Sequence, residues 1–135
     1  MATRGLYKFY EDEERMHEQK PTAVIYRHWD NYIEGGGIDL KEILDFCKSG
    51  TFDGRTRDAS YLASKFVVFL AQTFAGDWKE NPLDFISVGI CPTNAELDMW
   101  QEYTYHIICN GDNVPVFVDY DDFIKQPLEE ALEKV

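Results

Sequence analysis

The side chains best suited to chemistry in this 135-residue chain stand together between positions 26 and 37. This run follows a predicted strand and precedes a predicted helix, which is a common place for binding and catalytic residues. The candidate binding residues are Arg27, His28, Asp30, Tyr32, Glu34, Gly35, Gly36 and Gly37. His28 and Asp30 are also the catalytic candidates, because a carboxylate can orient an imidazole for proton transfer.

Other chemistries fit this run less well. Three glycines before a helix suggest a phosphate cradle, but the known glycine-rich phosphate motifs are missing and the neighbouring carboxylates repel anions. His28, Asp30 and Glu34 offer metal ligands without a second histidine nearby, so we expect no metal and no cofactor. No nucleophile stands in a recognisable elbow or active-site motif. A purely structural interpretation stays open, in which the polar residues satisfy the loop and the glycines supply its backbone angles.

A smaller cluster, Arg55-Thr56-Arg57, has the forked donors that bind phosphate or carboxylate. Asp53 and Asp58 flank it and cancel its charge, so we interpret it as a locally neutral loop.

The charge distribution excludes some partners and favours others. The chain has 25 acidic and 13 basic residues, a formal net charge of -12, which disfavours direct binding to nucleic acid or anionic lipid. Residues 81–135 carry -9 of this charge. The C-terminal part is therefore expected to present an acidic face, suited either to solubility alone or to docking on a protein with a basic surface.

The composition also bears on compartment. An apolar content of 44% predicts a folded chain, and neither a membrane-spanning run nor a signal peptide is evident. Cys47, Cys91 and Cys109 form an unpromising disulfide framework, so we expect reduced, buried thiols and a cytoplasmic setting, which includes a host cell's cytoplasm.

The hydrophobic pattern predicts a single α+β domain over residues 1–135. The strands expected are 3–10, 22–29, 84–91, 102–109 and 114–118, and the helices 39–48 and 59–75, with an acidic helix from Asp121 that is regular over 128–134. Residues 11–21 are expected to form a solvated hairpin loop, and Asp39 to cap the first helix. The order ββαα-βββα favours a largely antiparallel five-stranded sheet with two to three helices on one face and the other face exposed.

Several short motifs resemble a family of small uncharacterised phage, prophage and bacterial proteins. They are a Thr3-Arg4 start, the run from Tyr26 to Tyr32, the Glu34–Gly37 step, Tyr61-Leu62-Ala63 and Glu102-Tyr103-Thr104-Tyr105. The family pattern reads Y-x-H-x-D-G-Y-P, whereas this chain has Asn31 for glycine and Ile33 for proline. The resemblance implies a phage or mobile-element setting and no particular reaction.

Two functional hypotheses follow. The first is an interaction protein without catalysis, which binds a macromolecular partner through the acidic C-terminal face or the Trp29–Gly37 loop. One version is a modulator that occupies the basic nucleic-acid groove of a host protein. The second is a small-molecule-binding protein or enzyme whose site lies at the end of the second strand. The sequence does not specify an oligomeric state.

Overall fold

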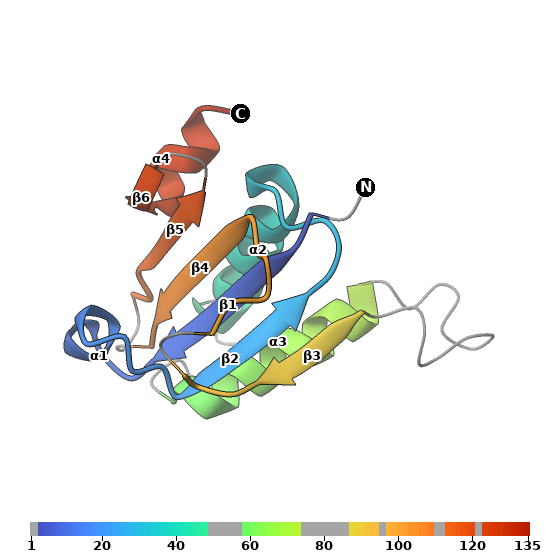
Figure 1. The fold of residues 1–135 in the computed structure, drawn as a ribbon. Coiled ribbons are helices and arrows are strands. Elements are labelled where there is room, and N and C mark those ends of the chain that lie inside the picture. The colour runs from blue at the N-terminus through green and yellow to red at the C-terminus, as the bar shows by residue number, and fades with distance from the viewer. Residues whose placement is uncertain (1–2, 49–57, 74–86, 95–96, 110–112, 121–122) are drawn as a thin grey trace.

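The computed structural model describes residues 3–48, 58–73, 87–94, 97–109, 113–120 and 123–135. Its centre is a sheet in the order β3-β2-β1-β4-β5-β6, with α2 and α3 against one face (Figure 1). The strands are β1 (Gly5–Tyr10), β2 (Ala23–Arg27), β3 (Val88–Cys91), β4 (Tyr103–Ile108), β5 (Val116–Tyr120) and β6 (Phe123–Pro127). The helices are α1 (Glu13–His17), α2 (Ile38–Lys48), α3 (Ala59–Thr73) and α4 (Leu128–Glu133), and a π-helical turn, η1 (Ile33–Gly37), precedes α2.

The predicted α+β class is confirmed, while the sheet differs in two respects. It has six strands, because residues 123–127 pair with β5 before α4 begins. It is also mixed, since β1 and β4 run parallel. After β3 the chain crosses one face of the sheet, and the next strand, β4, lies between β1 and β5 (Figure 1). A parallel neighbour of this kind needs a crossover connection and cannot be made by a hairpin.

The main core lies between the sheet and its helices. Alternate residues of the strands point toward α2 and α3. The apolar residues of α3 recur at helical spacing, so they form one stripe that packs against the sheet. Tyr7 of β1 packs against Phe66 of α3 with ring centroids 4.7 Å apart. The largest buried members of this core are Tyr7, Phe9, Leu40, Leu62, Phe66, Leu70, Tyr105 and Ile107.

The opposite face of the sheet was expected to be exposed, and this prediction is wrong. Leu6, Val24 and Ile108 point away from α2 and α3, yet each is at most 2% exposed. The segment between β3 and β4 passes in front of this face (Figure 1), and Met16 of α1 packs against Ile108. Both faces of the central strands are therefore buried.

Residues 11–21 join the antiparallel strands β1 and β2 and are mostly exposed, as expected for a solvated hairpin loop, but they also contain a short helix and a buried side chain. Asp12 Oδ1 accepts a hydrogen bond from the Arg15 backbone N–H at 2.8 Å, which caps the short helix α1. Met16 is 2% exposed and anchors α1 against Tyr10. Within the described residues, no helix is long and apolar enough to cross a membrane. The Arg55–Arg57 cluster lies outside the residues that the structure describes.

Candidate functional site

The candidate binding residues at the end of β2 are divided between the two faces of the sheet. Arg27 points toward the helices, where its Nη1 donates to Asp39 Oδ2 at 2.8 Å. Their side chains are only 7% and 14% exposed, so this is a buried ion pair. Asp39 was expected to cap the helix. Because η1 runs directly into α2, Asp39 stands inside a continuous helical segment and binds the Arg27 guanidinium instead.

His28 follows Arg27 and lies beside Tyr26, whose side chain is on the other face. The Tyr26 hydroxyl is 2.6 Å from His28 Nδ1, and the Trp29 ring packs edge-on against the imidazole at 4.5 Å. Asp30 has a φ of 60° in the turn that follows. The partner found for His28 Nδ1 is therefore a tyrosine, not the carboxylate of the predicted pair.

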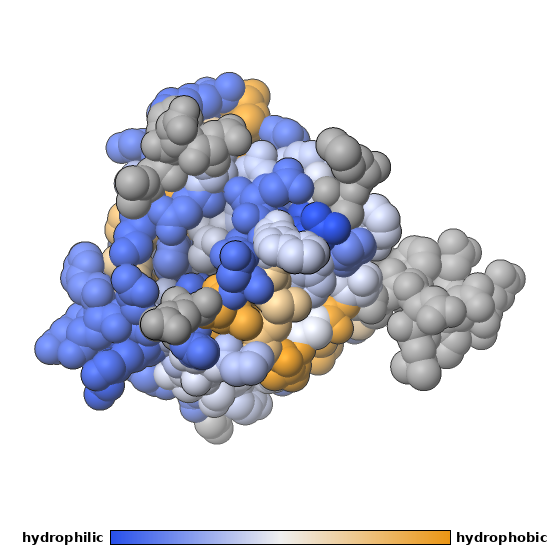
Figure 2. Space-filling model, viewed as in Figure 1, coloured by the Kyte–Doolittle hydropathy of each residue, from blue (hydrophilic) through white to orange (hydrophobic). Residues whose placement is uncertain are grey.

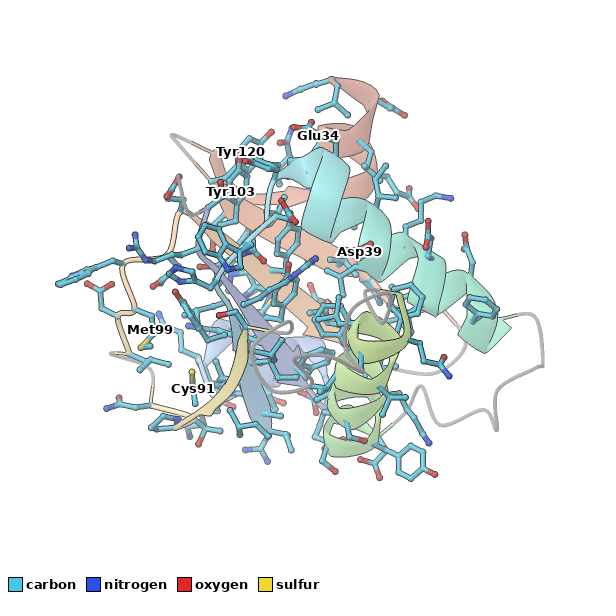
Figure 3. All side chains as sticks on the ribbon, turned by 90° about the vertical axis from the view of Figure 1, so that its right-hand side faces the viewer. Glu34, Asp39, Cys91, Met99, Tyr103 and Tyr120 are labelled. Carbon is cyan, nitrogen blue, oxygen red and sulfur yellow. The ribbon has the colours of Figure 1, made fainter. Side chains whose placement is uncertain are left out.

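Two of the remaining candidates have their side chains on the surface, at η1 or directly before it. Tyr32 and Glu34 are exposed, and Figure 3 shows Glu34 at the same end of the sheet as Tyr103 and Tyr120, whose rings stack at 5.5 Å. Tyr32, Glu34 and His28 line none of the pocket described below.

The residue that organises this segment is Asn31, which the sequence marked only as a departure from the family pattern and not as a candidate site residue. Its Nδ2 donates to the carbonyl oxygens of Thr3 at 2.5 Å and Arg27 at 2.7 Å, and its Oδ1 accepts from the Tyr7 hydroxyl. The Tyr105 hydroxyl donates to the Asn31 carbonyl at 2.7 Å. Burial raises the pKa of Tyr7 and of Tyr105, so both phenols stay protonated as donors.

The glycines of η1 belong to the same arrangement. Gly36 is buried, and a Cβ at this position would overlap the Tyr7 hydroxyl. A Cβ on Gly35 would lie 2.5 Å from the Asp30 carbonyl oxygen. The sequence left two interpretations of these glycines open, an anion cradle that fitted poorly and a structural role in supplying the backbone angles of the loop. In the structure they permit close packing of a helical turn on the core, which favours the structural interpretation.

A second polar cluster lies across β1, β4 and β5 on the face that α1 partly covers. The Tyr10 hydroxyl is 2.9 Å from His106 Nδ1, and His106 Nε2 is 2.6 Å from Asp119 Oδ2. This geometry fits a neutral imidazole that accepts from Tyr10 and donates to Asp119. Burial lowers the pKa of His106 despite its bond to Asp119. Burial alone would raise the pKa of Asp119, but hydrogen bonds from His106 and the Lys125 backbone lower it below its usual range.

This second cluster resembles a proton relay, but its Tyr10 and His106 members are buried, and among the three only the Asp119 side chain, 33% exposed, reaches solvent. Tyr10 is 1% exposed and His106 is 5% exposed. A substrate could not reach the phenol, so the arrangement is suited to holding three strands together. An alternating strand with one histidine was the only sequence signal for it, and the partners Tyr10 and Asp119 are far away in the chain.

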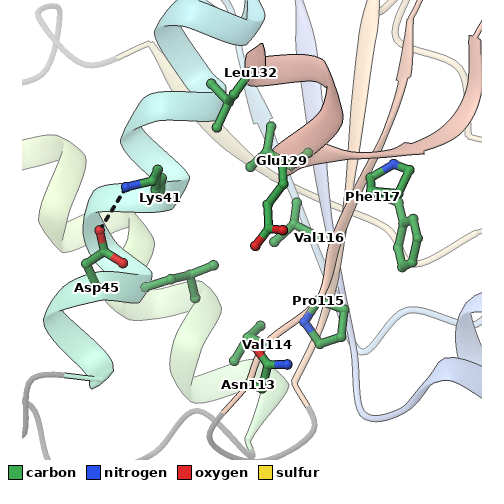
Figure 4. Close-up of a pocket in the computed structure, with 12 residues that line it drawn as sticks. Lys41, Asp45, Asn113, Val114, Pro115, Val116, Phe117, Glu129 and Leu132 are labelled. Atoms are coloured by element: carbon green, nitrogen blue, oxygen red, sulfur yellow. Dashed lines mark hydrogen bonds and ion pairs between the residues drawn. The ribbon is translucent and has the colours of Figure 1, made fainter.

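The structure contains an open pocket in a different place, between α2, β5 and α4 (Figure 4). Its volume is about 310 Å³. The lining combines an apolar set with a polar rim, and consists of Lys41, Leu44, Asp45, Asn113, Val114, Pro115, Val116, Phe117, Pro127, Leu128, Glu129 and Leu132. Lys41 Nζ and Asp45 Oδ2 form an exposed ion pair at 3.3 Å on the α2 side.

The helices beside this pocket carry an excess of carboxylates. Glu129 extends from α4 toward the space that faces Lys41 and Asp45 (Figure 4). Exposed acidic side chains on the same two helices are Glu42, Asp45, Glu129, Glu130 and Glu133. Among the side chains of these helices that the structure describes, the exposed bases are Lys41 in α2 and Lys134 at the C-cap of α4, so the described surroundings are net negative.

Neither metal chemistry nor a family assignment follows from these observations. Among the described residues, no three His, Cys, Asp or Glu side chains are grouped so that they could hold a metal ion. Comparisons with protein-family models, curated proteins and solved structures find no match to this chain.

Proposed function

We propose that this protein acts by binding a macromolecular partner with a basic surface, and that the partner docks at the pocket between α2, β5 and α4. The observation that carries the proposal is the pocket itself, whose apolar lining opens between two helices with exposed carboxylates. An apolar side chain of the partner would enter the pocket, while basic groups beside it would meet Glu129 and its neighbours.

The pocket chemistry supports a partner that is both apolar and basic. The pocket lining includes the apolar side chains of Leu44, Val116 and Leu132. Covering this apolar surface would lower the free energy of the complex, because water is released from it. Lys41 already interacts with Asp45, whereas Glu129 is exposed at the pocket edge. A docked lysine or arginine would therefore find an accessible carboxylate next to an apolar cavity.

The alternative, a small-molecule or catalytic site at the end of β2, has less geometric support. Arg27 is buried in its ion pair with Asp39, and His28 lies with Tyr26 on the opposite face. The glycines are occupied by packing against Tyr7 and Asp30. These groups therefore do not converge on one place where a ligand could contact all of them.

We extend the proposal to a reducing, cytoplasmic setting, including that of a host cell in which a phage-encoded protein would work. Cys91 and Cys109 are free thiols, and Cys109 is 1% exposed, which supports a compartment without disulfide formation. A basic nucleic-acid-binding groove on a host protein is the concrete form of partner that we favour, because it supplies the complementary charge.

Binding of a designed probe tests this proposal. The probe is a short amphipathic peptide of lysine and leucine, compared with an all-lysine peptide of the same length, and affinity is followed by fluorescence anisotropy. We expect the amphipathic peptide to bind more tightly. Its affinity should fall as salt rises from about 0.01 M to about 1 M, because the screening length shrinks from about 30 Å to about 3 Å.

A matched pair of variants locates the interaction. Leu132→Lys places a cation in the pocket and should weaken binding by about tenfold or more, equivalent to about 1.4 kcal/mol. Val68→Lys adds the same charge at an exposed position of α3, outside the pocket lining, and should change affinity little. Equal effects of both variants, or an affinity that salt does not change, would refute the proposal.

A further inference from the structure

The two edges of the sheet are protected to different degrees. The outer strand β6 contains Lys125 with a φ of 49° and ends at Pro127, and its pairing with β5 is irregular near Tyr120. Lysine, proline and irregular pairing are devices that prevent an edge strand from pairing with another chain. The other outer strand, β3, has no lysine and no irregular pairing between Val88 and Cys91, and Pro92 follows it only after its last paired residue.

The pairing of β3 with β2 shows which backbone groups face outward. The two strands are antiparallel, with Val88 opposite Arg27 and Ile90 opposite Ile25. The His28 N–H donates to the Ser87 carbonyl at 3.0 Å, in the same register. Hydrogen-bonded pairs alternate along an antiparallel ladder, so Gly89 and Cys91 also point their backbone groups at β2. Val88 and Ile90 therefore direct their N–H and C=O groups toward the open edge.

The side chains of β3 fit an interface better than a solvated edge. Ile90 is 85% exposed, and a Cβ on Gly89 would meet no atom within 4 Å. Figure 2 shows apolar surface in the region of β3. The described residues 87–94 include no charged side chain, although the chain as a whole carries -12.

We propose that β3 pairs with β3 of a second copy of this chain and extends the sheet across a two-fold axis. A second copy is the favoured occupant because residues 87–94 carry no carboxylate that would attract a basic partner, and because an antiparallel pair of identical uncharged strands brings no like charges opposite each other, although each chain as a whole is acidic. Val88 and Ile90 would exchange backbone hydrogen bonds with Ile90 and Val88 of the second copy. Gly89 would lie opposite Gly89 of the second copy, at a close pair where glycine leaves space.

Sedimentation measurements over a concentration series test the pairing. The wild-type chain should approach twice the monomer mass as concentration rises. Ile90→Pro removes an outward N–H that β2 does not use and should leave a monomer. Ile90→Asp, at a position that is already exposed, should do the same by placing charge in the interface. Val68→Asp is the matched control on α3 and should dimerise like wild type.

A cross-link tests the register. Gly89→Cys in a Cys91→Ser background should form an intermolecular disulfide under mild oxidation, because the two Cα atoms would be about 4.5 Å apart. A wild-type chain that stays monomeric at every concentration would overturn the proposal. This result would also be expected if β3 paired with an extended segment of another protein instead of a second copy. A dimer that persists in both Ile90 variants would overturn it as well, and absence of the cross-link would overturn the register.

Discussion

Replacing Asp39 with asparagine should destabilise the fold strongly, because it leaves the Arg27 guanidinium buried without its counter-charge. The two side chains are 7% and 14% exposed and are joined at 2.8 Å. Removing one partner of a buried pair typically costs 3–5 kcal/mol. Arg27 also interacts with the Tyr7 hydroxyl, so we expect the lower end, about 3 kcal/mol.

Urea unfolding followed by circular dichroism measures this loss. At a slope of about 1.5 kcal/mol per M, a loss of about 3 kcal/mol lowers the midpoint by about 2 M. Asp45→Asn is the matched control on the same helix, because the Lys41–Asp45 pair is about 60% exposed. Exposed pairs contribute little, so this control should change the free energy of unfolding by less than about 1 kcal/mol.

A double replacement separates charge burial from packing. Arg27→Met with Asp39→Leu removes both charges and keeps apolar volume, so it should recover most of the stability that Asp39→Asn loses. The reasoning would be refuted if Asp39→Asn cost no more than Asp45→Asn. It would equally be refuted if the double variant were less stable than Asp39→Asn alone.

Two further predictions concern acid stability and close packing. The free energy of unfolding should fall as pH drops below 6.5, because burial lowers the pKa of His106 and the unfolded chain takes up this proton first. Because the pKa of Asp119 is lowered, the free energy of unfolding should fall further below pH 3.8. Urea unfolding at a series of pH values measures both effects, and His106→Gln should reduce the pH dependence just below pH 6.5. The same pH dependence in this variant would contradict the role given to His106. Gly36→Ala should cost about 1–3 kcal/mol in the same assay, because its Cβ overlaps the Tyr7 hydroxyl; an unchanged free energy of unfolding would argue against the packing described for Gly36.

Regular hydrophobic spacing made much of the architecture predictable. The stripe of α3 and the alternation in β4 predicted both elements within a few residues of their observed bounds. The strand β6 was missed because Lys125, Gln126 and Pro127 are poor strand formers, and pairing with β5 decides their conformation. The helix α1 was missed because its stability depends on burial of Met16 against residues distant in sequence.

The candidate site was less predictable, since its parts come from separate segments. Arg27 and His28 are neighbours at the end of a strand, so alternation already implied opposite faces. The role of Asn31 depends on Tyr7 and Tyr105 meeting in the parallel pair of β1 and β4, which local sequence does not reveal. The pocket likewise forms only where α2, β5 and α4 meet.

Amide chemical-shift mapping tests the central claim most directly. The labelled protein is titrated with the lysine–leucine peptide, and perturbed backbone amides are mapped on the structure. The account predicts shifts concentrated at pocket residues of α2, β5 and α4, including Leu44, Val116 and Leu132. Shifts concentrated instead at residues 28–37, or spread evenly over the acidic surface, would contradict it.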